Sequence, residues 1–351
     1  MFRLGILFAA ALVSVLVGCK QNRSGNSVKL AAVGDTNGYK ILRDGTSDDP
    51  LKEVRGSLES QDLFIENFEG VILSHPASPA ACPAEQRQSA FFGPPEIADF
   101  LHPTAIAIAT LANNHISDCG LDGIVETTTE LRRRGVLVGG AGRNLNQACA
   151  PIRLEIDGVQ LAVLAYLAID DNRLLAGPNN PGAASWTACR GDAQVAALAA
   201  AGYIVVVAMH LHQGPAWNAE PSERDLTLVK RALDAGADLV IGHGPHVPQG
   251  IVESNGRVGL LSLGDFLVHP DYEIPESAKR SIIAQITISA NTIDVRLLPI
   301  RLDRAGRPIV PAPWDASWIL NDIAEQSARL GTKMTIENGI GRFSVQRRRE
   351  K

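Results

Sequence analysis

The sequence predicts an α/β fold built in layers, because short apolar runs alternate along the chain with longer amphipathic segments. The short runs are continuous and are stopped by a polar residue or a glycine, which is the pattern of buried strands. The longer segments repeat their apolar residues at helical spacing. Strands are expected at 29–35, 62–69, 105–110, 161–167, 203–210, 238–243 and 257–265, and helices at 121–134, 192–201 and 222–235.

The helix expected at 222–235 has the clearest beginning, since Ser222 is a good N-cap and Asp225 follows three residues later. Nearer the C-terminus, the runs 281–289 and 292–300 follow each other around a short polar turn, which predicts an antiparallel hairpin. Residues 312–331 have the pattern of a final helix. No internal repeat or low-complexity linker divides the chain, so a single domain over residues 29–345 is the preferred interpretation.

The first 18 residues are typical of a secretory signal, with one early Arg, a short apolar run and then small residues. Leu16 to Cys19 resemble the lipobox of bacterial lipoproteins, in which the Cys carries the lipid; an ordinary signal peptide is the alternative. The polar residues 19–28 would then be a flexible tether. We expect a lipid-anchored, extracytoplasmic protein of the bacterial cell envelope, and Lys20 favours the outer membrane or its periplasmic face.

The net charge limits the class of binding partner, and the number of cysteines bears on the cellular compartment. The formal net charge of −5 argues against nucleic acid, because phosphate binding needs a basic face. The basic run Arg347 to Arg349 is interpreted as a solvated chain end, with attraction to anionic headgroups as the alternative. Besides Cys19, four cysteines permit two disulfides in three pairings, and buried free thiols are equally compatible. They are Cys82, Cys119, Cys149 and Cys189.

Polar side chains gather where the expected strands end. In an open α/β sheet, ligands bind beyond the carboxyl ends of the strands, so we expect these segments to converge on one site. Carboxylate, amide and imidazole groups together are the mixture that zinc, manganese or iron prefers. Taken singly, each residue has a structural alternative as a turn residue, a helix cap or a core histidine. The set is Asp35, Glu66, Glu69, Asn113, Asn114, His115, His210, His212, His243 and His246.

Seven motifs carry a resemblance to a known family: VGDTN, ENFEG, LANNHISDCGLDGI, GGAGRN, HQGPAW, AGADLVIGHGPHVPQG and SLGDF. With them, the chain resembles the CapA/PgsA poly-γ-glutamate capsule-synthesis proteins from about Lys29 to Pro270. The fold of that family is similar to the calcineurin-like metallophosphoesterases. The resemblance therefore implies a metallophosphoesterase-like layered β-sandwich flanked by helices, in the four-layer order αββα.

The resemblance also implies roles for individual residues around one or two divalent ions of manganese, zinc or iron. Asp35 and Glu69 would be carboxylate ligands, with Glu69 bridging two ions. Asn114 would be an amide ligand, and His115 would protonate the leaving group. The remaining ligands would be imidazoles, and both members of the pair His210 and His212 compete for one of these positions because they leave the strand end on the same side. The histidines implied are His212, His243 and His246, with His210 as the competitor.

The chain departs from the family pattern at four points. Ala216 stands where the family usually has Glu, Gly244 where it has His, and Asp265 where it has Asn. The Asp-x-His motif of calcineurin-like phosphoesterases is absent, since Asp35 is followed by Thr36 and then Asn. One residue that is either a ligand or a carboxylate supporting a ligand is therefore missing, while the carboxylate of Asp265 is added. A single metal, or a site that binds without turnover, stays an alternative to a full two-metal centre.

Three functions follow from these observations. The first is an accessory role in capsule or exopolymer assembly, with capsule-synthesis membrane proteins as partners and a lipid anchor holding the chain at the membrane. The second is an envelope metallohydrolase that acts on a phosphorylated or polyanionic substrate. The third is a purely structural role for the polar cluster. An acidic chain binds an acidic polymer only through a metal or a local basic pocket.

Overall fold

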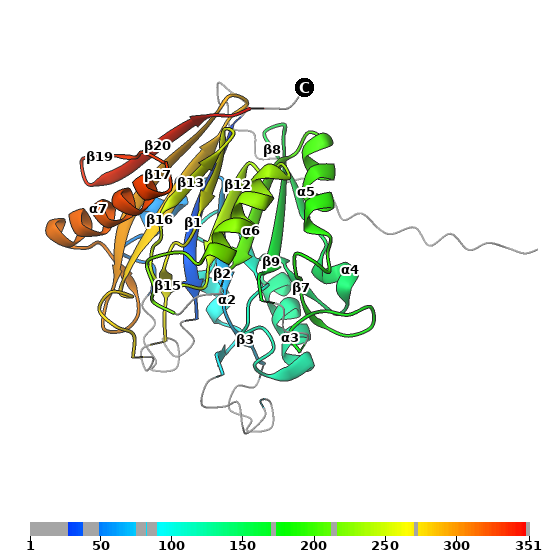
Figure 1. Cartoon of the computed structure of the whole chain (residues 1–351). Helices are drawn as coiled ribbons and strands as arrows, with labels where there is room; N and C mark the ends of the chain where they lie inside the picture. Colours follow the sequence, from blue (N-terminus) through cyan, green and yellow to red (C-terminus); the bar gives the residue numbers. More distant parts are fainter. Residues whose placement is uncertain are drawn as a thin grey trace, which may run out of the picture.

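The architecture is two large β-sheets packed face to face, with helices on the outer faces (Figure 1). The computed structural model describes residues 27–37, 49–74, 82, 90–169, 173–211, 216–269 and 273–348. The expected signal segment with Cys19, most of the expected tether, and His212 lie outside the described residues. The extent of the single domain, 29–345, stays a prediction.

One sheet has ten strands and is mixed. Its central strand β1 runs parallel to β2 and antiparallel to β16, and β15 pairs with the end of β1. The main path is β19 (Thr335–Glu337), β20 (Ile340–Gln346), β17 (Thr292–Leu302), β16 (Arg280–Ile288), β1 (Val28–Thr36), β2 (Leu63–Phe68), β5 (Ile106–Thr110) and β6 (Leu137–Gly139), with β15 (Asp265–Leu267) and β18 (Pro308–Ile309) beside it.

The second sheet has six strands, of which β9, β11, β12 and β14 are parallel. Its order is β13 (Ile251–Ser254), β14 (Arg257–Leu260), β12 (Leu239–His243), β11 (Ile204–His210), β9 (Val159–Leu167) and β8 (Ile152–Ile156). Two small sheets complete the strands, formed by β3 (Val71–Ile72) with β4 (Phe92–Gly93) and by β7 (Ala141–Gly142) with β10 (Gly182–Ala183).

Three apolar cores hold the layers together. The core between the sheets contains side chains from both, such as Ile65 of β2 and Val206 of β11. Neighbouring residues on these strands point outward because side chains alternate along a strand; Phe64 joins the core outside the ten-stranded sheet, and Val207 the one outside the six-stranded sheet. The four-layer αββα prediction is thereby confirmed.

The outer layers contain most of the helices. The core on the ten-stranded sheet includes residues of α1 (Arg55–Glu59), α2 (Ile97–Phe100) and α3 (Gly120–Arg133). The core on the six-stranded sheet includes residues of α4 (Leu145–Ala148), α5 (Gly191–Ala200) and α6 (Glu223–Asp234). The final helix, α7 (Pro313–Arg329), instead buries apolar residues in the core between the two sheets.

The predicted helices, the final helix and the hairpin β16–β17 are confirmed, and the Ser222 side chain accepts a hydrogen bond from the Asp225 amide as an N-cap. The single strand expected at 257–265 is wrong. The chain forms β14 in one sheet, crosses to the other, and begins β15 there. The crossing is tight, since a Cβ at Gly34 would lie 1.8 Å from the carbonyl oxygen of Gly264.

The expectation of a solvated basic chain end is wrong for Arg347. Its guanidinium is 3% exposed and binds the buried carboxylate of Asp238 through Nε at 2.5 Å and Nη2 at 2.9 Å. The main-chain amide of Arg347 also donates to the carbonyl oxygen of Asn291. The last described residues therefore tie the ten-stranded sheet to the loop that precedes β12.

Two disulfides answer the open question of cysteine pairing. Cys82 pairs with Cys119, and Cys149 pairs with Cys189, so the free-thiol alternative is wrong. Cys119 lies directly before α3 and packs with Val71. Among the helices of the described residues, none combines the length and the apolar character needed to cross a bilayer.

Candidate metal centre

The predicted convergence of strand ends is present. Asp35 lies near the carboxyl end of β1, and Glu69 directly follows β2, with its amide bonded to the carbonyl oxygen of Thr36. His210 and His243 are the last residues of the neighbouring parallel strands β11 and β12 and are paired in register. Parallel strands bring these ends together at one edge, as the sequence predicts.

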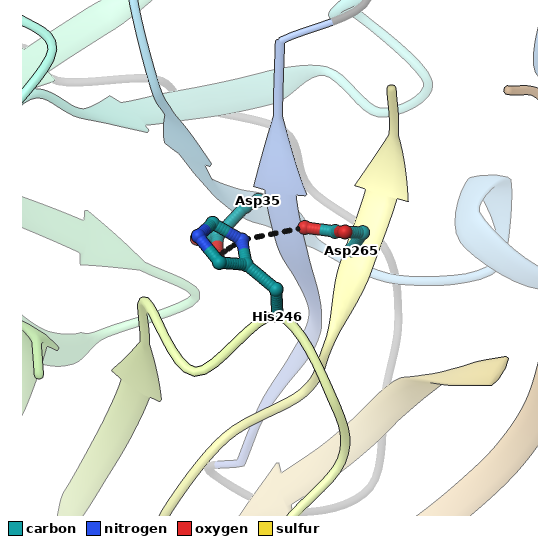
Figure 2. A group of neighbouring side chains, drawn as sticks. All are labelled: Asp35, His246 and Asp265. Carbon is teal, nitrogen blue, oxygen red and sulfur yellow. Dashed lines mark hydrogen bonds and ion pairs between the residues drawn. The ribbon is translucent and has the colours of Figure 1, made fainter. Parts of the chain in front are cut away.

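Asp35, His246 and Asp265 form the tightest group, and Figure 2 shows their side chains directed toward one another. His246 Nδ1 lies 2.9 Å from Asp265 Oδ1 and 3.2 Å from Asp35 Oδ2. Ligand atoms of the three residues all lie within 4.8 Å of one another, and all three side chains are buried. Asp265 reaches this group because β15 pairs in parallel with β1, which places it beside Asp35.

Glu69 lies between this group and two more histidines. Its Oε2 is 4.0 Å from His246 Nδ1, and its Oε1 is 3.6 Å from His210 Nε2. His243 Nδ1 lies 3.5 Å from Asp35 Oδ1. Each oxygen of the Glu69 carboxylate thus faces a different imidazole, an arrangement compatible with the bridging role that the family resemblance implies for this residue.

The Gly-Pro bend after β12 explains how two histidines three residues apart reach one site. Gly244 has φ +101° and His246 has φ +60°, which turns the chain sharply between them. A Cβ at Gly244 would lie 2.4 Å from the carbonyl oxygen of Leu211, so only glycine fits. The Gly244 amide donates to Asp35 Oδ2 at 3.1 Å. The main chain of the bend therefore helps to hold the Asp35 carboxylate in place.

The protonation tendencies are those of an anionic, buried cluster. Burial would raise the pKa of Asp35, but hydrogen bonds and charges from His243 and His246 outweigh it and hold the pKa well below the ordinary value. Burial raises the pKa of Glu69 to about 8, with a further contribution from Asp35, and burial raises the pKa of Asp265 to about 6. Burial opposes the charged form of His246, yet Asp265 and Glu69 raise its pKa well above the ordinary value.

A divalent metal fits these residues. The side chain of His243 is 1% exposed, and its Nε2 makes no hydrogen bond to any residue that the structure describes. The Oδ1 atom of Asn114 is likewise buried without a hydrogen-bond partner within the described ranges. Leaving such groups unsatisfied costs about 1–3 kcal/mol each, and an ion coordinated by His243 would remove that cost for its Nε2. Carboxylate and imidazole donors together suit zinc, manganese or iron.

His115 belongs to a second part of the site, in the segment between β5 and α3. Its Nδ1 lies 2.8 Å from Asp118 Oδ2, and the Phe91 ring stacks on the imidazole at 4.1 Å between centroids. The Phe91 amide donates to the same carboxylate oxygen at 2.7 Å. Burial would lower the pKa of His115, but the hydrogen bond with Asp118 and the charges of Glu69 and Asp118 outweigh it and raise the pKa.

Two residues of the site were missed by the sequence argument. Asp118 orients His115, and the His-x-x-Asp spacing, which places the two side chains one turn apart, is a signal that could have found it. Asn67 donates to Asp35 Oδ1 at 2.8 Å, and its Nδ2 lies 3.2 Å from His210 Nδ1. Asn67 is also held by Asn113, which donates to Asn67 Oδ1.

Some of the residues predicted for the site lie in the cluster and others do not. The structure brings Asp35, Glu69, His243 and His246 together, and the competing residue His210 and the added carboxylate Asp265 join them. His212 lies outside the described residues. Glu66 does not face the cluster, because the strand alternation directs it to the same side as Phe64 and Phe68, into the core outside the ten-stranded sheet. Asn37 does not replace the missing motif histidine either, since its Oδ1 accepts from the His269 amide.

Comparisons with known proteins show which family this chain resembles. Residues 29–270 match the family described as bacterial capsule synthesis protein PGA_cap. The PGA biosynthesis protein CapA of Bacillus subtilis is 31% identical over 160 residues, covering 44% of this chain and 41% of that protein. A probable polyglutamine synthesis accessory protein of Mycobacterium tuberculosis is 29% identical over 246 residues, covering 65% of this chain and 63% of that protein.

Among solved structures, the NAD nucleotidase of Haemophilus influenzae is similar with a TM-score of 0.45 and 11% identity, covering 84% of this chain and 62% of that one. The matched regions span less than two thirds of each relative. Because the family match extends over more than half of the residues, the chain belongs to the bacterial capsule synthesis protein family PGA_cap.

Proposed function

We propose that this protein acts in the synthesis or assembly of a poly-γ-glutamate capsule or a related acidic exopolymer, through a divalent metal centre. The observation that carries the proposal is the buried cluster itself. Three carboxylates and three imidazoles face one another within a few ångströms in a chain of the capsule-synthesis family. A purely structural role does not account for the buried Nε2 of His243, which lacks a hydrogen-bond partner in the described part of the chain.

The proposal includes a place in the cell. The apolar leader that ends in Cys19 supports a lipid anchor on the outer side of the bacterial membrane, in the cell envelope. Capsule-synthesis membrane proteins would then be the neighbours of the tethered chain. The two disulfides support this location, because such bridges persist in oxidising compartments.

The residues divide into two groups around the proposed centre. Asp35, Asp265 and His246 would hold one ion, with Glu69 and His210 beside it for a second; His243, which faces Asp35, and Asn114 are the further ligands that the family resemblance implies. A bound divalent ion supplies Lewis-acid polarisation of a substrate oxygen and stabilises charge that develops there. The protein's own part is to exclude water from the cluster and to position the proton donor.

That donor is His115. Asp118 accepts a hydrogen bond from Nδ1, which fixes the tautomer and leaves Nε2 to deliver a proton to a leaving oxygen or nitrogen. Against the effect of burial, Asp118 and Glu69 raise the pKa of His115, which favours the protonated imidazole. The pair favours a second candidate function, a metal-dependent envelope phosphoesterase, because phosphoester cleavage needs a protonated leaving group.

Metal content is the decisive test. The soluble form that begins after Cys19 is purified beside a His243→Ala, His246→Ala double variant and a His102→Ala control, whose histidine lies outside the cluster. Elemental analysis is expected to find manganese, zinc or iron in stoichiometric amounts in the wild type and the control, and little in the double variant. Metal missing from all three after reconstitution would refute the metal centre. A screen for phosphodiester and polyglutamate cleavage then separates the two candidate functions.

A further inference from the structure

A continuous groove runs along the outer side of the six-stranded sheet, over the helix pair α5 and α6. Three cavities of about 590, 730 and 570 Å³ lie end to end. The first and second share Thr227 and Arg231, and the second and third share Ala196, Asp234 and Ala235. We call this feature the seam groove. It follows α6, whose 12 residues alone extend about 18 Å.

The seam groove begins beside the metal centre. Leu167 and Ala168 line its first cavity. Leu167 is the register partner of His210, and the Ala168 amide donates to the His210 carbonyl oxygen at 3.0 Å. The first cavity of the groove therefore lies next to the strand end that carries His210.

Basic side chains recur along the whole groove. The lining contains six basic and five acidic residues, in a protein whose net charge is −5. Two ion pairs lie within the lining, Asp192 with Arg231 and Asp238 with Arg347, so four basic and three acidic residues remain outside these pairs. The basic residues are Arg224, Lys230, Arg231, Arg257, Arg347 and Arg348, and the acidic residues are Asp192, Glu223, Asp225, Asp234 and Asp238.

Two of these cations are available to a ligand. Within the part of the chain that the structure describes, Lys230 and Arg348 form no ion pair, and both are exposed. They lie in different cavities, Lys230 in the middle and Arg348 at the far end. The facing side of α5 contributes Asp192, which pairs with Arg231 of α6, and beyond it only the small residues Ala196, Ala199 and Ala200.

We propose that the seam groove binds an extended polyanion, held as a strand along α6 while one of its units occupies the metal centre. Each cavity alone has the volume of a usual small-molecule pocket, and the shared lining residues place the three in a row along α6, so a long ligand could contact all of them while a compact one could not. Spaced cations suit a polymer with one carboxylate in each unit. The identification of that polymer as poly-γ-glutamate rests on the proposed function.

Binding of fluorescently labelled poly-γ-glutamate to the metal-loaded mature chain tests the groove. The variant Lys230→Glu, Arg348→Glu reverses two groove charges, and Lys52→Glu, Lys333→Glu makes the same charge change on exposed residues elsewhere. At low ionic strength the groove variant is expected to raise Kd about tenfold, and the control less than about twofold. Equal Kd values for the two variants would overturn the proposal. So would equal affinity for a γ-glutamyl dimer, which is too short to follow the groove.

The experiment separates the groove from the metal centre. Loss of polymer binding in the groove variant, with metal content unchanged, supports the groove. Polymer binding that is abolished by His243→Ala, His246→Ala but untouched by the groove variant assigns the polymer to the centre alone, which overturns the groove and leaves the proposed function standing. If the wild type ignores polyglutamate but binds polyphosphate through Lys230 and Arg348, the groove is upheld and the polymer of the proposed function is wrong.

Discussion

Replacing Gly244 by Ala tests the bend between His243, at the end of β12, and His246. At φ +101° an L-residue costs about 1–3 kcal/mol. The added Cβ would also lie 2.4 Å from the Leu211 carbonyl oxygen and 3.2 Å from His210 Nε2. A backbone atom has to move, which adds on the order of 2 kcal/mol. We expect a total loss of about 3–5 kcal/mol in the free energy of unfolding.

The matched control is Gly158→Ala in the turn between β8 and β9. Gly158 has φ +79°, but a Cβ there would meet no atom within 4 Å, so only the backbone cost of about 1–2 kcal/mol remains. Thermal unfolding of the metal-free proteins should show a Tm lowered by about 6 °C or more for Gly244→Ala and by about 2–3 °C for Gly158→Ala. Elemental analysis should show reduced metal in the first variant only. Equal Tm shifts and equal metal content would refute the steric argument.

Three further predictions concern buried charges. Asp265→Asn removes one carboxylate from His246, so metal retained after dialysis should fall, as measured by elemental analysis; unchanged retention would mean that Asp265 is no ligand. Burial raises the pKa of Glu66 from 4.5 to about 8, so the unfolded chain ionises first as pH rises and the metal-free protein should lose stability between pH 4.5 and 8. Glu66→Gln should remove that part of the loss in denaturant titrations across this range, and an unchanged pH profile would contradict the assignment. Arg347→Met leaves the Asp238 carboxylate buried without its cation and should cost about 3 kcal/mol, whereas adding Asp238→Asn should recover part of it, with urea unfolding as the measurement.

The sequence predicts well what depends on local pattern. Apolar runs and helical spacing locate the strands and helices, and the rule that parallel strands end at one edge brings Asp35, Glu69, His243 and His246 together. Glu66 shows the limit of that argument. It lies three residues before Glu69 at the same strand end, but the pleat directs it into the opposite core, and only the strand register decides which side each carboxylate faces.

The features that could not be predicted depend on contacts between distant segments. The mainly apolar stretch between Arg257 and Asp265 gives no sign that the chain changes sheet, yet this crossing is what brings Asp265 beside Asp35. Arg347 and Asp238 are 109 residues apart, and nothing near either residue indicates the pair. The disulfide partners are likewise chosen by the packed fold, because all three pairings are equally compatible with the spacing of the cysteines.

The ligand types of the candidate centre are divided between the two sheets. The carboxylates of Asp35 and Asp265 belong to the ten-stranded sheet and that of Glu69 directly follows its strand β2, whereas the imidazoles of His210, His243 and His246 belong to the six-stranded sheet or to the loop that follows its strand β12. Either sheet alone offers half a coordination sphere. An ion bound here would therefore link the two sheets at the edge where these strands end. Its affinity would depend on how completely the two sheets have packed against each other.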